Sequence, residues 1–226
     1  MKKVIAFSLW GNDTRYTHGA LENIELAKEV YPDWVCRFYM GKDTSVEIVE
    51  QMAENDNVEI IKMGEKCDWT GMFWRFYAAC DPTVDVMISR DCDSRLWYRE
   101  KNAVDEWIQS PHMFHIMRDH PYHNVPILGG MWGAKKGCLP NIQNAIQSIE
   151  KGDYWQVDQE FLTRYEYPVV KDKSMVHDEF FEKKSFHCKR DPKHFVGQAY
   201  AGNGRILDAE EYFHQFTERY RNEYLR

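Results

Sequence analysis

Short apolar runs and segments with helical spacing alternate along the opening part of the chain. The apolar runs predict buried strands at residues 4–9, 35–40, 58–63 and 84–89. Between the strands, apolar residues at every third or fourth position predict helices, and Pro32 ends the first of them. This order of strands and helices is typical of a parallel sheet covered by helices on both faces. We therefore expect an α/β fold with a mostly parallel central sheet.

The rest of the chain has a less regular pattern. Further strands are predicted at 114–117 and 127–134. Predicted helices cover 71–80, 99–108, 140–149, 156–164 and a charged, amphipathic segment at 210–225. Pro, Gly and Ser do not cluster into a linker and no internal repeat is found, so we expect residues 1–226 to form a single domain.

Length and charge exclude several classes of protein. A chain of 226 residues suits one hydrophobic core. The net charge of −7 argues against non-specific nucleic-acid binding, which needs a basic surface. The first apolar run is too short for a signal peptide, and no run approaches the roughly 18 apolar residues of a membrane span. We therefore expect a cytoplasmic protein. One acidic domain without an evident repeat also makes a monomer the expected state.

The most informative segment follows the fourth predicted strand, where Asp91 and Asp93 stand one residue apart. Ligands of open α/β sheets bind beyond the carboxyl ends of the strands. Two neighbouring carboxylates repel each other unless a cation lies between them, and Mg²⁺ prefers carboxylate and phosphate oxygens. The motif therefore predicts a clamp for a metal ion and a diphosphate. The alternative is a solvated loop in which Arg90 or Arg95 pairs with the acids.

Five motifs in this order resemble GT-A-type glycosyltransferases, including small viral and bacterial sugar transferases. They are SLWGND, GMFWRFYAACD, VDVMISRDCDSR, FHIMRDHPYHNVPILGGMWGAKKG and YWQVDQEFL, and the resemblance covers residues 2–200. It implies a single-domain, GT-A-like nucleotide-diphospho-sugar transferase fold. Residues 1–95 would form the nucleotide-binding half, 96–200 the acceptor-binding half and 205–226 a C-terminal helix.

The resemblance also implies a metal site for Mn²⁺ or Mg²⁺. Asp93 would bind the ion directly, and Asp91 would bind either the ion or the ribose of the donor. A late histidine is often a third ligand in this superfamily. His177 is our first choice because it follows a predicted strand, and His187 and His194 are the alternatives.

Four further residues are implied to contact the donor nucleotide. Ser8 and Trp10 end the first strand, where the family holds the nucleoside, and Tyr16 would stack on the base. Arg75 would reach the diphosphate or hold the loop of Asp91 and Asp93 in place. Core packing is the alternative for Trp10, and an ion pair on the helix surface is the alternative for Arg75.

An inverting transferase needs a base that deprotonates the hydroxyl of the acceptor. Asp158 is our first candidate because it stands at the start of a predicted helix, and Asp119 is the second. A helix N-cap is the alternative role for Asp158, since aspartate is favoured there.

We therefore expect a glycosyltransferase that moves a hexose or deoxyhexose from a nucleotide-diphosphate sugar, with UDP as the first guess, to a glycan or other hydroxyl acceptor. A phosphatase of the haloacid-dehalogenase type also places two aspartates after a strand, but its strand normally opens the domain. A nucleotidyltransferase would carry a Gly-rich basic loop after the first strand. A non-catalytic module that binds a sugar or nucleotide is the remaining alternative.

Overall fold

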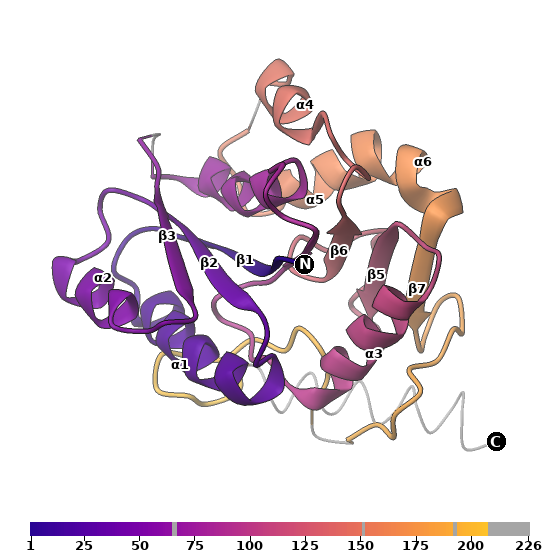
Figure 1. Cartoon of the computed structure of the whole chain (residues 1–226), viewed down its shortest axis with the longest axis horizontal. Coiled ribbons are helices and arrows are strands. Elements are labelled where there is room, and N and C mark those ends of the chain that lie inside the picture. Colours follow the sequence, from indigo (N-terminus) through magenta and orange to yellow (C-terminus); the bar gives the residue numbers. More distant parts are fainter. Residues whose placement is uncertain (65–66, 151, 192–193, 208–226) are drawn as a thin grey trace.

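The computed structural model describes residues 1–64, 67–150, 152–191 and 194–207. Within them lies a seven-stranded sheet in the order β3-β2-β1-β4-β6-β5-β7 (Figure 1). The strands are β1 (Lys3–Leu9), β2 (Val35–Met40), β3 (Val58–Lys62), β4 (Val86–Ser89), β5 (Phe114–Arg118), β6 (Trp132–Lys135) and β7 (Ser174–Asp178). Only β6 runs antiparallel to its neighbours in this sheet. The predicted α/β fold with a mostly parallel sheet is confirmed.

Helices cover both faces of the sheet (Figure 1). One face carries α1 (Thr14–Val30), α2 (Val46–Ala53) and α3 (Tyr98–Gln109). The other carries the 3-10 helix η1 (Trp69–Ala79), α4 (Ile142–Ser148), α5 (Val157–Phe161), the π-helical turn η2 (Leu162–Glu166), α6 (Tyr167–Val170) and the 3-10 turn η3 (Lys171–Lys173). The sheet is therefore buried on both sides, which is why its strands read as apolar runs.

Strand β1 shows how one run of apolar residues serves two cores. Val4 and Ala6 belong to the apolar cluster under η1, whereas Ile5, Phe7 and Leu9 belong to the cluster under α1. Successive side chains of a strand point to opposite faces, so the two clusters take alternate residues. All five side chains are buried, and the carboxyl end of β1 is fixed next to that of β4.

Two predicted elements differ from the structure, and a third cannot be compared with it. The predicted strand 127–134 begins only at Trp132, because residues 129–131 form a turn and a bend in which Gly130 packs against Asp91. The predicted helix 156–164 is α5 followed by the π-helical turn η2. The predicted terminal helix 210–225 lies outside the described residues. Within the described residues, no helix combines the length and the apolar character that a bilayer crossing requires.

Candidate functional site at the carboxyl end of β4

Two acidic side chains leave the end of β4 on either side of a buried cysteine. Cys92 is buried, and its thiol donates a hydrogen bond to the carbonyl oxygen of Ser8 at 3.4 Å. This contact fixes the loop of residues 91–93, the acidic loop, against the end of β1. The Asp91 side chain is 43% exposed and the Asp93 side chain 12% exposed, so both carboxylates lie at the edge of the core.

Arg75 joins the acidic loop to α5. Its guanidinium forms an ion pair with Asp91, and its Nη2 donates to Oδ2 of Asp158 at 2.8 Å. Arg75 and Asp158 are both buried, at 4% and 1% exposure. Burial raises the pKa of the Asp158 carboxyl, the charge of Asp91 raises it further, and Arg75 opposes both. The three side chains therefore form one charged unit at the boundary between core and solvent.

The backbone of η1 is placed by the end of β1. The hydroxyl of Ser8 accepts a hydrogen bond from the backbone N–H of Arg75 at 3.0 Å and donates to the carbonyl oxygen of Met72 at 3.4 Å. Ser8 is buried, so its hydroxyl is used within the protein. Ser8 thereby fixes the backbone position from which the Arg75 side chain extends.

Gly129 and Gly130 let the carboxylates pack directly against backbone. A Cβ on Gly129 would overlap Oδ2 of Asp158 and lie 2.7 Å from Nη2 of Arg75. A Cβ on Gly130 would overlap the carboxylate of Asp91. A glycine lets another group approach the backbone closely. In the structure the groups that approach are the protein's own carboxylates.

Asp93 has its own cationic partner at the start of α1. Nε of Arg15 donates to Oδ2 of Asp93 at 2.8 Å, and Asp13 caps α1 by accepting from the backbone N–H of Arg15 at 2.9 Å. Burial raises the pKa of the Asp93 carboxyl, and the charge of Asp91 adds to that effect, whereas Arg15 opposes it. The two carboxylates of the acidic loop therefore lie close enough for their charges to repel each other.

Two residues of α1 that sequence reasoning missed hold the acidic loop. The amide of Asn23 donates to the carbonyl oxygen of Ser94 at 2.8 Å and accepts from the N–H of Leu96 at 3.0 Å. A Cβ on Gly19 would overlap the carbonyl oxygen of Cys92. A signal was present, because Asn23 interrupts the apolar face of the helix and a buried amide needs partners.

The acids do not pair with the arginines adjacent to them in sequence. Arg90 is buried and lies 3.2 Å from Oε1 of Glu100, and Arg95 pairs with Glu22. The alternative in which Arg90 or Arg95 neutralises the acidic loop is therefore wrong, because each has a carboxylate of its own on a helix.

Trp10 and Tyr16 pack into different apolar clusters, on opposite faces of the sheet. Trp10 is partly buried, with its ring centroid 6.0 Å from that of Trp74 and 6.5 Å from that of Trp69. Tyr16 packs with the α1 core and lies under the guanidinium of Arg15. Burial raises the pKa of Tyr16 to about 12, and the charge of Asp93 contributes. Tyr16 is therefore a neutral phenol next to the acids.

Asp119 lies in a separate ionic cluster. It is fully buried, and its carboxylate accepts from Arg99 at 3.0 Å, from the N–H of Val196 at 3.0 Å and from Arg190. Asp119 therefore ties the segment around Val196 to α3. None of these contacts involves Asp91, Asp93 or Asp158, so the structure does not bring the two candidate bases together.

His177 is likewise apart from the acidic loop. One ring nitrogen lies 2.8 Å from His115 and the other 3.1 Å from Oε2 of Glu106. His187 also contacts Glu106, at 2.8 Å, and His194 contacts Asp191 at 3.0 Å. Within the described ranges, no group of three or more His, Cys, Asp and Glu side chains is arranged to enclose a metal ion.

Asp158 is not the N-cap of α5, which was the alternative role for this residue. The N-cap of α5 is Gln156, whose side chain makes no capping hydrogen bond, and Asp158 lies in the first helical turn. Its carboxylate points into the protein toward Arg75 instead. The ion pair with Arg75 offsets the cost of burying this carboxylate.

No protein-family model matches the chain, and no curated protein matches its sequence. Solved structures do match. A glycosyltransferase involved in glycosylation of the major capsid of PBCV-1 superposes with a TM-score of 0.53 at 14% identity, over 96% of this chain and 100% of that one. The mannosyltransferase PcManGT from Pyrobaculum calidifontis, in complex with GDP-Man and Mn²⁺, gives 0.55 at 14% identity, over 94% and 70%.

Nucleotidyltransferases share the same architecture. A 4-diphosphocytidyl-2C-methyl-D-erythritol synthase from Anaerococcus prevotii matches with a TM-score of 0.52 at 12% identity, over 78% of this chain and 89% of that one. At these identities the likeness concerns the fold. The chain therefore has the GT-A-like fold of nucleotide-sugar transferases and nucleotidyltransferases, as predicted.

Proposed function

We propose that this protein is a glycosyltransferase that moves a hexose or deoxyhexose from a nucleotide-diphosphate sugar to a hydroxyl of a glycan or other acceptor. The observation that carries the proposal is the charged unit of Arg75, Asp91 and Asp158 at the carboxyl end of β4. Ligands of open α/β sheets bind at this edge. The solved glycosyltransferases of the same fold support transfer as the reaction.

The composition of the site fits a divalent cation. When ionised, Asp91, Asp93 and Asp158 carry three negative charges against the two positive charges of Arg15 and Arg75. The excess is negative, and Asp91 is the most exposed of the three acids. Mg²⁺ is commonly held by one or two carboxylates and completes its shell with water and substrate phosphates. Two carboxylates on one loop suit that mode.

In this proposal Asp91 and Asp93 hold Mn²⁺ or Mg²⁺, which when bound supplies charge neutralisation for the departing nucleotide diphosphate. Arg15 and Arg75 add positive charge on either side of the same loop. During transfer the bond from the anomeric carbon to the diphosphate oxygen breaks. The electron pair of that bond leaves with the nucleoside diphosphate, a bond to the acceptor oxygen forms, and the proton of the acceptor hydroxyl passes to the departing diphosphate or to solvent.

The geometry favours a positioning role for Asp158 rather than the expected role of base. Its carboxylate is buried and already accepts a hydrogen bond from Arg75. A base must lie within hydrogen-bond reach of the proton that it takes. Asp119 is enclosed by Arg99 and Arg190 in another cluster. We therefore propose that Asp158 fixes Arg75, and that Arg75 fixes Asp91.

Binding of UDP, GDP and dTDP tests the proposal. Calorimetry with and without Mn²⁺ is carried out on the wild type, on Asp93→Ala and on a control, Asp56→Ala, at an exposed position after α2. We expect one nucleotide to bind in a metal-dependent manner to the wild type and the control but not to Asp93→Ala. If no nucleotide shows metal-dependent binding, the proposal is overturned.

The products separate transfer from the alternative chemistry of this fold. A glycosyltransferase releases nucleoside diphosphate from the nucleotide sugar. A nucleotidyltransferase instead releases pyrophosphate from a nucleoside triphosphate and a sugar phosphate. The protein is incubated with a nucleotide sugar in one sample, and with a nucleoside triphosphate and a sugar phosphate in another. Chromatography of the products identifies the class of transferase. Pyrophosphate release as the only reaction would contradict the proposal.

A further inference from the structure

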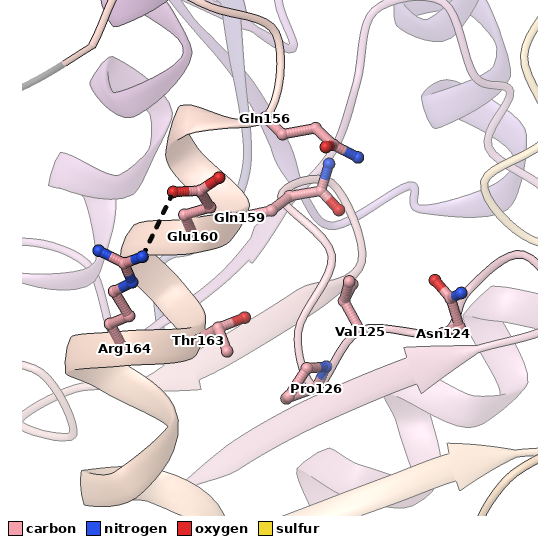
Figure 2. Close-up of a pocket in the computed structure, with 8 residues that line it drawn as sticks. All are labelled: Asn124, Val125, Pro126, Gln156, Gln159, Glu160, Thr163 and Arg164. Carbon is pink, nitrogen blue, oxygen red and sulfur yellow. Dashed lines mark ion pairs between the residues drawn. The ribbon is translucent and has the colours of Figure 1, made fainter.

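A small cavity lies between α5 with η2 on one side and the segment before Gly129 on the other (Figure 2). One wall is the segment Asn124, Val125 and Pro126, and the other is formed by side chains of α5 and η2 together with Gln156. The volume is about 220 Å³, below the roughly 300–1,000 Å³ of pockets for drug-sized ligands. The cavity therefore suits one small unit, such as a single sugar ring.

Both walls continue into the charged unit. On α5, Asp158 points inward to Arg75, and the next residue, Gln159, lines the cavity. On the opposite wall, Pro126 is three residues before Gly129, whose backbone packs against Asp158. The carbonyl oxygen of Pro126 accepts a 2.6 Å hydrogen bond from Arg118, which holds this wall in place. The cavity and the charged unit are therefore built on the same two segments of the chain, α5 and the segment that ends at Gly129.

The surface of the cavity is mostly apolar, and the polar side chains that border it carry no net charge. Among the described residues, the side chains of Asn124, Gln156, Gln159 and Thr163 form no hydrogen bond with protein groups, so their donors and acceptors are open to a ligand. In Figure 2 the two glutamine amides face the opening between the walls.

The two charged residues of the lining are occupied with each other. Glu160 pairs with Arg164 at 4.0 Å and accepts from the hydroxyl of Tyr154 at 2.8 Å. A phosphate or carboxylate would find no uncompensated positive charge here. A neutral ligand with several hydroxyl groups fits, because each amide can both donate and accept.

We infer that this cavity binds a neutral sugar unit, and that Gln156 and Gln159 recognise its hydroxyl groups. The identification of this sugar as the acceptor rests on the proposed transfer reaction. A π-helical turn at η2 supports the inference, since such turns are frequent at functional sites. The turn brings Thr163 and Arg164 to the same wall as Gln159.

Saturation-transfer NMR with the methyl glycosides of glucose, galactose and mannose tests the inference. The wild type is compared with the double variant Gln156→Ala/Gln159→Ala and with the control Gln51→Ala, at an exposed glutamine of α2. We expect at least one glycoside to bind the wild type and the control, and at least a tenfold weaker affinity in the double variant. Thermal unfolding of each variant checks the fold. If the double variant is destabilised, the single variant Gln156→Ala, at an exposed position, takes its place.

No binding of any glycoside to the wild type, or equal binding to the double variant, would overturn the inference. Nucleotide calorimetry on the same samples separates it from the proposed function. Nucleotide binding without glycoside binding contradicts only the sugar cavity. Glycoside binding without nucleotide binding keeps the cavity and contradicts the transfer reaction.

Discussion

Nη2 of Arg75 lies 2.8 Å from Oδ2 of Asp158, although 83 positions separate the two residues in the chain. The same guanidinium pairs with Asp91, so η1 supplies the cation that connects α5 to the acidic loop. Burial strengthens this dependence, because a buried charge without its partner is costly. Arg75 is therefore the residue on which both the stability and the arrangement of the site depend.

Replacement of Arg75 should reveal this double role. We expect Arg75→Met to lower the free energy of unfolding by about 3–5 kcal/mol, because it leaves the buried Asp158 carboxylate without a partner. Adding Asp158→Asn should recover part of the loss, since a neutral amide needs no counter-charge. Urea unfolding measures both. Arg164→Met, which breaks an exposed pair with Glu160, should cost less than about 1 kcal/mol. Equal costs for the two arginines would contradict this account.

The acidic loop should be needed for turnover and not for folding. Asp91→Ala and Asp93→Ala each remove a carboxylate at the edge of the core, and we expect each to reduce turnover of the nucleotide sugar nearly to background. Their thermal midpoints should stay close to that of the wild type. Initial rates and thermal unfolding are the two measurements. Turnover like that of the wild type in both variants would refute the metal clamp.

Gly130 should tolerate no side chain. A Cβ there would overlap the Asp91 carboxylate, so Gly130→Ala must displace Asp91 or the backbone. We expect it to weaken metal-dependent nucleotide binding at least tenfold. Gly64→Ala is the matched control, because a Cβ at Gly64 meets no atom within 4 Å. Calorimetry on the two variants makes the comparison, and unchanged binding by Gly130→Ala would count against the arrangement of the acidic loop.

Buried histidines should make the fold sensitive to mild acid. Burial lowers the pKa of His115 and of His123 well below the ordinary value of about 6.5. The unfolded chain therefore binds protons that the folded chain excludes, and the free energy of unfolding falls as the pH drops below about 6.5. Each histidine contributes a slope of at most about 1.4 kcal/mol per pH unit.

Urea unfolding between about pH 7.5 and pH 5.5 measures that slope in a range above the titration of ordinary carboxyl groups. His115→Gln should reduce it, whereas His18→Gln, at an exposed position, should leave it unchanged. A slope that His115→Gln does not alter would show that this ring does not govern the pH response.

Sequence reasoning identified the acidic loop because its signal is local. An apolar strand followed by two acids places the carboxylates at the end of that strand whatever surrounds them. It did not identify Arg15, and it singled out Arg75 only through the resemblance, because both arginines come from other elements and Arg90 and Arg95 stood closer in the chain. Ion pairs form between residues that packing brings together, and sequence distance says little about that.

The chain by itself determined the α/β class, the parallel order of the early strands and the position of Asp91 and Asp93 at a strand end. Those features follow from the period of apolar residues, which each segment carries internally. Only the tertiary structure decided that Asp158 faces Arg75, that Asp119 and His177 belong to other clusters, and that Gln159 lines a cavity. These relations depend on how helices far apart in sequence pack on one sheet, and no single segment encodes them.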